Sequence, residues 1–161
     1  MKKLVGSDVV VTGGLGFIGS HLVKRLVSEK ANVHVFGLGS KQNLKGVLDK
    51  ITMHRIDLRR YDSVKKALER IKPNKIFHLA AHVNVSRNLN YRKMLDNNFN
   101  GTVNLLKAAE SIDYDCFIRS TDPKHEENVK NIFQFHIPFV ILGDITKIYL
   151  TIRQKNCLLT T

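Results

Sequence analysis

The sequence predicts an α/β fold, a doubly wound parallel sheet of about six strands with helices on both faces. The main observation is an alternation: short runs rich in Val and Ile, such as DVVVT at 8–12, precede amphipathic segments of helical period, such as 17–30. This alternation is typical of βαβ units, whose sheet is covered on both faces. A length of 161 residues, with 43% hydrophobic and 25% charged residues, is sufficient for one domain with its own core.

The individual elements follow from these runs. Strands are predicted over 8–12, 33–37, 51–56, 75–81, 114–120 and 138–143, and helices over 17–30, 61–72, 93–111 and 124–134. Acidic residues near the start of the second helix and Pro73 just beyond its end are consistent start and stop signals. We expect one domain over 1–143 and a tail over 144–161, interpreted as an extra strand, a frayed tail or the product of a truncated reading frame.

Charge and cysteine content restrict the partners. The formal charge of +12, from 26 basic and 14 acidic residues, favours anionic partners such as nucleotides, sugar phosphates or nucleic acid. Nucleic acid is the least favoured, because the chain has no aromatic platform or recognition-helix motif. Cys116 and Cys157 lack disulfide or metal-ligand spacing, so no metal site is predicted. Without a signal peptide pattern or a long apolar run, a soluble cytoplasmic protein with no membrane partner is expected.

Residues 12–19, TGGLGFIG, lie directly after the first predicted strand and directly before the first predicted helix. The glycines fit two patterns, G-x-x-G-x-x-G from Gly13 and G-x-G-x-x-G from Gly14. In such a unit, glycines permit the tight turn, the approach of the backbone to a pyrophosphate and the close packing of the helix, whose N-terminus attracts the diphosphate. The stretch therefore predicts dinucleotide binding, and the alternative is a purely structural glycine turn.

The end of the second predicted strand bears on the choice of cofactor. Proteins that bind the ribose 2′-hydroxyl of NAD usually carry Asp or Glu at this point. Here the position is Gly37, with Ser40 and Lys41 shortly after it. Because Gly37 has no carboxylate, nothing at this position would repel a 2′-phosphate. The hydroxyl of Ser40 and the ammonium of Lys41 could bind one, so the segment slightly favours NADP over NAD. The alternative is that Lys41 lies in solvent.

These motifs resemble those of the extended short-chain dehydrogenase/reductase family, the NAD(P)-dependent nucleotide-sugar epimerases and dehydratases, which have a Rossmann-like domain. TGGLGFIGSHLVKRL resembles the opening fingerprint of the family and favours the glycine pattern that starts at Gly13. IDLRRYDSV resembles the segment that contacts the adenine, although Asp57 alone could simply cap the next helix. The resemblance implies contacts of the cofactor with Gly13, Gly16, Phe17, Ile18 and Gly19 at the diphosphate and with Asp57 and Leu58 at the adenine.

Three later stretches extend the resemblance in the same order. KPNKIFHLAAHV resembles the motif of the fourth strand, which implies that Leu79, Ala80 and Ala81 line the cofactor. NNFNGTVNLLKAA resembles the following helix and implies a structural and cofactor-side role for Asn98. FIRSTD resembles the end of the fifth strand, where Thr121 would match the catalytic Ser/Thr beside the substrate. The plainer alternatives are a satisfied helix amide for Asn98 and a strand-end hydroxyl for Thr121.

The resemblance stops at Y-x-x-x-K, the motif whose Tyr is the family's acid/base and whose Lys lowers its pKa. The only tyrosine after Thr121 is Tyr149, with Arg153 four residues on in a segment predicted to be extended, so it is not expected to act as this acid. Tyr61 and Lys65 have the spacing, but they lie at the start of an earlier helix, where surface packing is expected. We therefore expect a cofactor domain that is incomplete after about residue 122 and lacks the substrate lobe.

Two functional hypotheses follow, and a third depends on charge alone. The resemblance implies an enzyme that oxidises a sugar hydroxyl of a nucleotide-sugar by hydride transfer to NAD or NADP, the opening step of epimerisation or dehydration. The second hypothesis is a truncated, inactive module that still binds the dinucleotide. The third is a basic nucleic-acid-binding protein, which only the net charge supports. Because family members are commonly dimers, a homodimer is considered as well.

Overall fold

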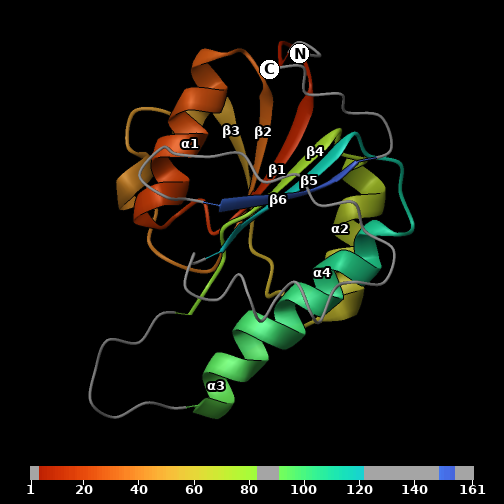
Figure 1. Cartoon of the computed structure of the whole chain (residues 1–161). Helices are drawn as coiled ribbons and strands as arrows, with labels where there is room; N and C mark the ends of the chain where they lie inside the picture. Colours follow the sequence, from red (N-terminus) through yellow and green to blue (C-terminus); the bar gives the residue numbers. More distant parts are fainter. Residues whose placement is uncertain (1–3, 83–90, 122–148, 155–161) are drawn as a thin grey trace.

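The computed structural model describes residues 4–82, 91–121 and 149–154, which form one sheet flanked by helices (Figure 1). Five strands are parallel: β1 (Asp8–Thr12), β2 (Asn32–Phe36), β3 (Ile51–His54), β4 (Lys75–His78) and β5 (Cys116–Thr121). The sixth, β6 (Tyr149–Gln154), runs antiparallel to β5. The strand order is β3-β2-β1-β4-β5-β6. The predicted α/β fold with a parallel sheet is thus confirmed, and part of the predicted tail adds an antiparallel edge strand.

The helices differ from their expected bounds in informative ways. Helices α1 (Phe17–Ser28) and α2 (Tyr61–Ile71) end within two residues of the prediction. The segment expected as one helix over 93–111 comprises α3 (Tyr91–Leu95), a π-helical turn η3 (Asp96–Asn100) and α4 (Gly101–Ala109). Short 3-10 turns, η1 (Gln42–Leu44) and η2 (Leu48–Lys50), connect β2 to β3. The predicted helix over 124–134 and strand over 138–143 lie outside the described residues.

The core is divided by the sheet into two layers, as the alternation of side chains along a strand requires. Val9 and Val11 of β1 pack with Val23 of α1 on one face, whereas Val10 packs with Leu68 of α2 on the other, together with α4. Figure 1 shows α1 on one side of the sheet and α2 and α4 on the other. The three consecutive valines of β1 are each 0% exposed, which explains why a central parallel strand reads as a continuous apolar run.

The order of the strands fixes where a ligand can bind. The chain moves outward from β1 through β2 to β3, then returns to the other side of β1 to form β4 and β5. The direction of winding therefore changes between β1 and β4. In open parallel sheets the crevice outside the carboxyl ends of the strands at such a point is the usual ligand site.

None of the helices in the described ranges has the length and apolar character needed to cross a bilayer.

Candidate cofactor site

The glycine loop, residues 12–19, leaves the carboxyl end of β1 at this point of the sheet. Gly13 has a φ of +72°, and a Cβ there would lie 2.6 Å from both the Ala80 nitrogen and the Leu79 carbonyl carbon. Left-handed φ is unfavourable for other residues, and both contacts are with backbone that has little room to move. The turn after β1 therefore requires glycine, and it lies directly against the segment that leaves β4.

Gly19 brings α1 down onto the same turn. A Cβ on Gly19 would collide with the carbonyl of Gly13 and lie 2.8 Å from the Cα of Gly14. Gly16 is different: it is exposed, it is the N-cap of α1, and its N–H donates to the Gly13 carbonyl at 3.0 Å. The outer glycines of the pattern are thus needed for packing, whereas the middle one leaves the backbone open to an approaching group.

The N-terminus of α1 is suited to an anion. No side chain caps this 12-residue helix, and its first turn contains no acidic residue. The N–H groups of a first turn have no partner within the helix, and the helix dipole adds partial positive charge there. The two side chains at this end, Phe17 and Ile18, are 78% and 50% exposed, which is unusual for large apolar residues. The arrangement can accept a diphosphate flanked by apolar groups.

Three further residues that are predicted to contact the cofactor lie on the segment that leaves β4, next to the glycine loop. The Leu79 amide donates to the carbonyl of Thr12 at 3.1 Å, and the Ala80 amide donates to the hydroxyl of Thr12 at 3.3 Å. Ala81 is exposed, and Leu79 and Ala80 are half-buried. The structure therefore brings Leu79 and Ala80 against Thr12 and Gly13, at the carboxyl ends of β1 and β4.

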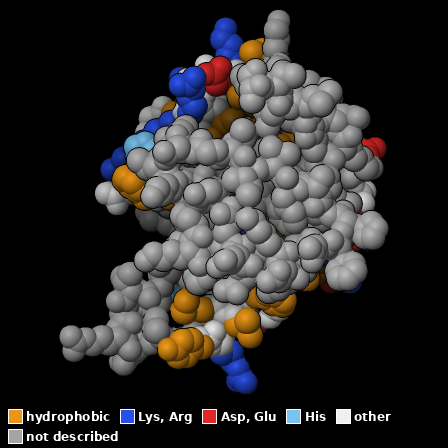
Figure 2. All heavy atoms as spheres, in the orientation of Figure 1, with side chains coloured by type: hydrophobic (Ala, Val, Ile, Leu, Met, Phe, Trp, Pro, Cys, Tyr) orange, Lys and Arg blue, Asp and Glu red, His pale blue; other side chains and the backbone are white. Residues whose placement is uncertain are grey.

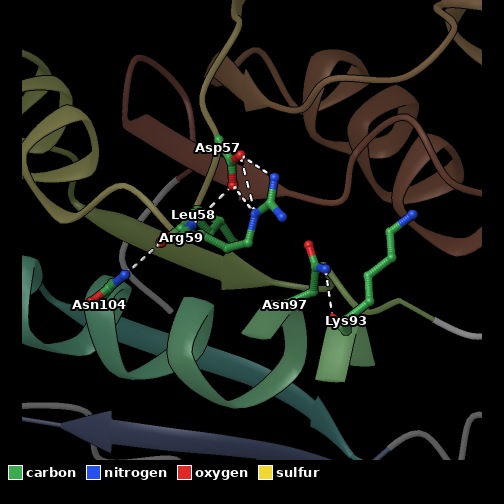
Figure 3. A network of polar contacts seen from close by, with 6 residues as sticks. All are labelled: Asp57, Leu58, Arg59, Lys93, Asn97 and Asn104. Carbon is green, nitrogen blue, oxygen red and sulfur yellow. Dashed lines mark hydrogen bonds and ion pairs between the residues drawn. The ribbon is translucent and has the colours of Figure 1, made fainter. Parts of the chain in front are cut away.

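Asp57 and Leu58 lie on the loop that follows β3 (Figure 3). Arg59 forms a bidentate ion pair with Asp57, in which the distances are 2.6 Å from Nη2 to Oδ2 and 2.9 Å from Nε to Oδ1. Hydrogen bonding from Arg59 lowers the pKa of Asp57, so the carboxylate remains charged. The cap interpretation of Asp57 finds no support, because the N-cap of α2 is Arg60 and no side chain caps this helix.

The same loop is fastened to α4. Figure 3 shows Asn104 directed at the backbone of Leu58, where its side-chain amide donates to the carbonyl at 3.0 Å. A Cβ on Gly101, one turn earlier in α4, would lie 3.2 Å from the Cβ of Leu58. Helix α4 therefore sets the position of the predicted adenine-contacting loop.

Asn98 holds the chain that follows β4. Its Oδ1 accepts from the His82 amide at 2.6 Å, and its Nδ2 donates to the His82 carbonyl at 3.1 Å. The side-chain amide thus pairs with a backbone peptide as a neighbouring strand would. Asn98 belongs to the π-helical turn η3, in which the Gly101 amide donates to the carbonyl of Asp96. Such turns are rare and are frequently found at functional sites.

The end of β2 is closed by an apolar side chain. A Cβ on Gly37 would lie 2.7 Å from Leu15 Cδ1. Leu15 therefore occupies the space next to the position that usually carries Asp or Glu in NAD-binding proteins. Ser40 and Lys41 are exposed, and the Ser40 hydroxyl accepts from the Gln42 amide at 3.3 Å. Lys41 is therefore exposed on the loop after β2, a placement that the NADP interpretation and its solvent alternative share.

The predicted catalytic residue is the last residue of β5. Thr121 pairs with Tyr149 across the antiparallel β5–β6 register, so β6 confirms that this tyrosine lies in an extended segment. Tyr61 packs at the edge of the core with the Lys107 ammonium 5.1 Å from its ring centroid, and Lys65 pairs with Glu69. The described residues bring no tyrosine and lysine of Y-x-x-x-K spacing to the crevice.

Sequence reasoning overlooked a buried chain of polar side chains beneath the crevice. His78 of β4 is 2% exposed and lies between two buried threonines. Its Nδ1 is 2.7 Å from the Thr12 hydroxyl, and its Nε2 is 2.8 Å from the Thr102 hydroxyl. Burial, and next the positive charge of Arg119, lower the pKa of His78 to about 3. A histidine within the apolar run KIFHLAA was the available signal.

The described residues contain no group of three His, Cys, Asp or Glu side chains that could hold a metal ion. What they contain is a glycine turn, an uncapped helix N-terminus and an apolar wall at the switch point of a parallel sheet. This combination is typical of dinucleotide-binding α/β proteins.

Comparisons with known proteins narrow the class. Residues 9–128 match the NAD dependent epimerase/dehydratase family. A curated relative, UDP-glucuronic acid decarboxylase 4 of Arabidopsis thaliana, is 36% identical over 117 residues, which cover 70% of this chain and 25% of the relative. The epimerase Mth375 of Methanothermobacter thermautotrophicus is 28% identical with a TM-score of 0.67, covering 74% of this chain and 36% of that one. A UDP-glucose 4-epimerase of Thermus thermophilus, solved with NAD, is 31% identical with a TM-score of 0.57, covering 65% and 34%.

The chain belongs to the NAD-dependent epimerase/dehydratase family, because the family match extends over most of its length. The predicted resemblance to this family is confirmed. The chain spans 25% of the length of the first curated relative and 36% of the first solved one.

Proposed function

We propose that this chain binds NAD or NADP at the glycine loop and belongs to the redox machinery of a nucleotide-sugar epimerase or dehydratase, with residues 1–143 as its cofactor domain. The observation that carries the proposal is the close contact of Gly13 with Leu79 and Ala80 beside the uncapped N-terminus of α1. This geometry leaves backbone N–H groups and apolar surface open at the switch point. A nucleotide diphosphate fits both.

The proposed contacts divide by element. The first turn of α1, with Gly16, Phe17 and Ile18, would hold the diphosphate, because its N–H groups have no partner within the helix. Asp57, kept charged by Arg59, would accept a hydrogen bond from the exocyclic amino group of adenine, with Leu58 beside the ring. The remaining predicted contacts would line the nicotinamide side: Leu79, Ala80, Ala81 and Asn98.

NADP is the proposed preference over NAD. Gly37 offers no carboxylate to a ribose 2′-hydroxyl, and Leu15 fills the space above it. Lys41 is exposed on the neighbouring loop and could meet a 2′-phosphate. Against this preference, the similar epimerase of Thermus thermophilus was solved with NAD. The comparison of both dinucleotides is therefore part of the test.

Nucleotide-sugar turnover is the second half of the proposal. Two of the proteins named above, the decarboxylase and the epimerase of Thermus thermophilus, act on UDP-sugars by their names, and Thr121 at the end of β5 would stand beside such a substrate. A correctly placed acid/base is worth about 10² to 10⁴ in rate, and the described residues offer none of the expected type. The competing proposal is a module that binds the dinucleotide without turnover.

A binding experiment tests the proposal directly. NADPH, NADH and their oxidised forms are titrated into the chain by calorimetry, and the melting temperature is measured at millimolar dinucleotide. A ligand bound only by the native state must raise the melting temperature. Incubation with UDP-glucose and oxidised cofactor, followed by analysis of the sugar product, separates the enzyme from the non-catalytic module, because epimerisation or dehydration returns the hydride and leaves no net reduced nicotinamide.

Gly16→Asp is designed to remove dinucleotide binding, and a second variant with the same added charge serves as its control. Asp is a favourable N-cap residue with an extended backbone, and Gly16 already has a φ of −74° and ψ of 176°. A Cβ at Gly16 would lie 3.3 Å from the Gly13 carbonyl oxygen, so the glycine loop must shift by a few tenths of an ångström. The melting temperature of the variant is therefore measured first, and in the folded variant the carboxylate would repel a diphosphate. Val5→Asp, an exposed position before the amino end of β1, adds the same charge as a control. Equal dinucleotide affinity in both variants, or no binding by the natural chain, would refute the proposed site.

Self-association is a further part of the proposal. Tyr91, Leu95, Phe99 and Val103 recur at every fourth position through α3, η3 and α4, and they are 73%, 59%, 58% and 44% exposed. Figure 2 shows orange apolar side chains gathered at the end of the molecule where Figure 1 places α3. An exposed apolar stripe of this kind supports a homodimer. Light scattering after size exclusion, with Leu95→Glu as the disrupting variant, tests it; a monomer at all concentrations would refute it.

A further inference from the structure

The buried hydrogen-bond chain Thr12–His78–Thr102 connects three separate elements beneath the candidate cofactor site. Thr12 ends β1, His78 ends β4 and Thr102 lies in α4, and these side chains are 0%, 2% and 5% exposed. None of the buried side-chain nitrogen and oxygen atoms in the described ranges lacks a partner. Buried polar groups satisfied in this way hold packed elements in one arrangement.

The proton of each hydroxyl fixes the direction of this chain. Thr102 donates its hydroxyl proton to the Asn98 carbonyl at 2.6 Å, so its oxygen can only accept from His78 Nε2. An uncharged His78 with its proton on Nε2 has a bare Nδ1, which accepts the hydroxyl proton of Thr12. The Thr12 oxygen in turn accepts from the Ala80 amide. Each donor in the chain therefore has one acceptor. The chain begins at the Ala80 amide and ends at the Asn98 carbonyl.

The charged surroundings of His78 agree with this assignment. Arg119 of β5 is paired with His78 in the strand register, and its positive charge opposes a second proton on the ring. The other groups that face the ring are the two threonine hydroxyls and the ring of Phe117. No carboxylate among the described residues contacts the imidazole to stabilise a charged form. The neutral ring is the form that completes the chain.

Both ends of the chain reach predicted cofactor-contacting residues. Thr12 directly precedes Gly13, and its hydroxyl holds the Ala80 amide. At the other end, the Asn98 peptide accepts from Thr102, while the Asn98 side chain holds both backbone groups of His82. The segment from Leu79 to His82 is thus held from β1 at one end and from η3 at the other, with His78 as the part common to both.

We propose that His78 is a positioning residue for dinucleotide binding: as the neutral Nε2–H tautomer it fixes the segment 79–82 at the distance from Gly13 that the cofactor requires. This inference rests on the proposed dinucleotide site, and His78 itself contacts no cofactor. A buried histidine with only a packing role would also stabilise the fold, but it would leave dinucleotide affinity unchanged whenever the fold persists.

Isosteric substitutions separate positioning from packing. Thr102→Val keeps the shape of the side chain and removes the acceptor of Nε2–H, at a site on α4 remote in sequence from the glycine loop. Thr102→Ser keeps the hydroxyl and serves as the matched rescue. We expect Thr102→Val to weaken NADPH affinity about tenfold, the value of one buried hydrogen bond, and Thr102→Ser to remain within about threefold of the natural chain.

Variants of His78 itself separate the two ends. Asn can replace the Nδ1 acceptor near Thr12, and Gln can replace the Nε2 donor near Thr102. We expect His78→Gln to weaken NADPH affinity more than His78→Asn, because the bond to Thr12 lies next to Gly13. Affinity unchanged in Thr102→Val and in both His78 variants, accompanied only by a lower melting temperature, would overturn the proposal.

Two measurements keep the inference distinguishable from the proposed function. Imidazole ¹⁵N chemical shifts at neutral pH should identify His78 as the Nε2–H tautomer; an Nδ1–H or charged ring would overturn the inference. Amide hydrogen exchange of Ala80 and His82 should accelerate in Thr102→Val and not in Thr102→Ser. If the natural chain binds no dinucleotide but these two results appear, the proposed function fails while the structural link survives. Unchanged exchange would refute the link itself.

Discussion

The glycine loop and the buried hydrogen-bond chain fix the same crevice by opposite means. The glycine loop works through missing side chains: Gly13 and Gly19 allow backbone to touch backbone. The buried chain works through directed side chains: Thr12, His78 and Thr102 pass one hydrogen bond to the next. The two meet at Ala80, whose nitrogen lies against Gly13 and donates to Thr12. The comparison indicates that the glycine loop sets the distance between the turn after β1 and the segment after β4. The buried hydrogen-bond chain sets how these two segments are aligned.

Gly13→Ala should have the largest effect, because it opposes both requirements of the glycine loop. The variant combines left-handed strain with a Cβ 2.6 Å from the backbone of Leu79 and Ala80. We expect a loss of stability above the roughly 1–3 kcal/mol of strain alone, and no dinucleotide binding in any chain that folds. Urea unfolding measures the first effect and calorimetric titration the second.

Gly46→Ala is the control for backbone strain. Gly46 has a φ of +86°, but a Cβ there would meet nothing within 4 Å. This variant should lose about 1–2 kcal/mol and keep its affinity for dinucleotide. Equal losses in the two variants would show that the close contact with β4 contributes nothing beyond strain.

The contrast between the two regions also explains what the sequence could predict. The turn at Gly13 is local, so its glycines stand within a short stretch beside a strand and a helix. The bond between Thr12 and His78 joins residues separated by 66 positions, and nothing in KIFHLAA states which face of the strand carries the histidine. The β1–α1–β2 unit and most strands were therefore predictable, whereas the buried chain required the assembled sheet.

Two further features, the π-helical turn and the pairing of β6, were not predictable for related reasons. The π-helical turn at Asp96–Asn100 interrupts a segment whose apolar spacing is helical throughout, and its role becomes visible only through the pairing of Asn98 with His82. An extra strand was one interpretation of the tail, but the antiparallel pairing of β6 depends on the available edge of β5. Both depend on partners remote in the sequence.

Acid should weaken the buried chain before it affects the glycine loop. The pKa of His78 is about 3 in the folded protein, so between pH 6.5 and 3 the unfolded chain binds the extra proton. The stability that this neutral ring supports is complete above pH 6.5 and is lost as the pH falls through that range, by at most about 1.4 kcal/mol per pH unit. Urea unfolding at pH 7, 6 and 5 measures the slope.

His78→Gln is the control for this slope, since Gln does not titrate. Its stability should be lower at pH 7 but should fall less between pH 7 and 5. Burial, followed by the nearby His34 and Arg70, also lowers the pKa of His54, so part of the slope will remain. Asp57, whose pKa is lowered, adds a loss only at more acidic pH. An identical slope in His78→Gln would contradict the neutral, buried state of His78.

If the proposed site binds a dinucleotide, cofactor preference should respond to substitutions at the end of β2. Gly37→Asp together with Leu15→Ala places a carboxylate at the ribose and removes the side chain that a Cβ would meet at 2.7 Å. We expect the ratio of NADPH to NADH affinity to fall by about tenfold, through repulsion of the 2′-phosphate and a new bond to the 2′-hydroxyl. Gly39→Asp, two residues on, adds the same charge as a control. A ratio that moves equally in both would assign the effect to general charge.

The smallest expected effect concerns Asn104, which lies outside both regions and fastens the loop after β3 to α4. Asn104→Leu removes one hydrogen bond to the Leu58 carbonyl at a half-buried position, which should cost about 1 kcal/mol of stability. If this loop contacts adenine through Asp57, then affinity for NADPH should fall by a few fold, whereas affinity for nicotinamide mononucleotide, which has no adenine, should not change. Asn100→Ala removes an exposed hydrogen bond to Asp96 within η3, the turn that precedes α4, and is the control. A parallel fall for both ligands in Asn104→Leu would mean that α4 acts on the whole crevice through the buried chain rather than on the adenine side alone.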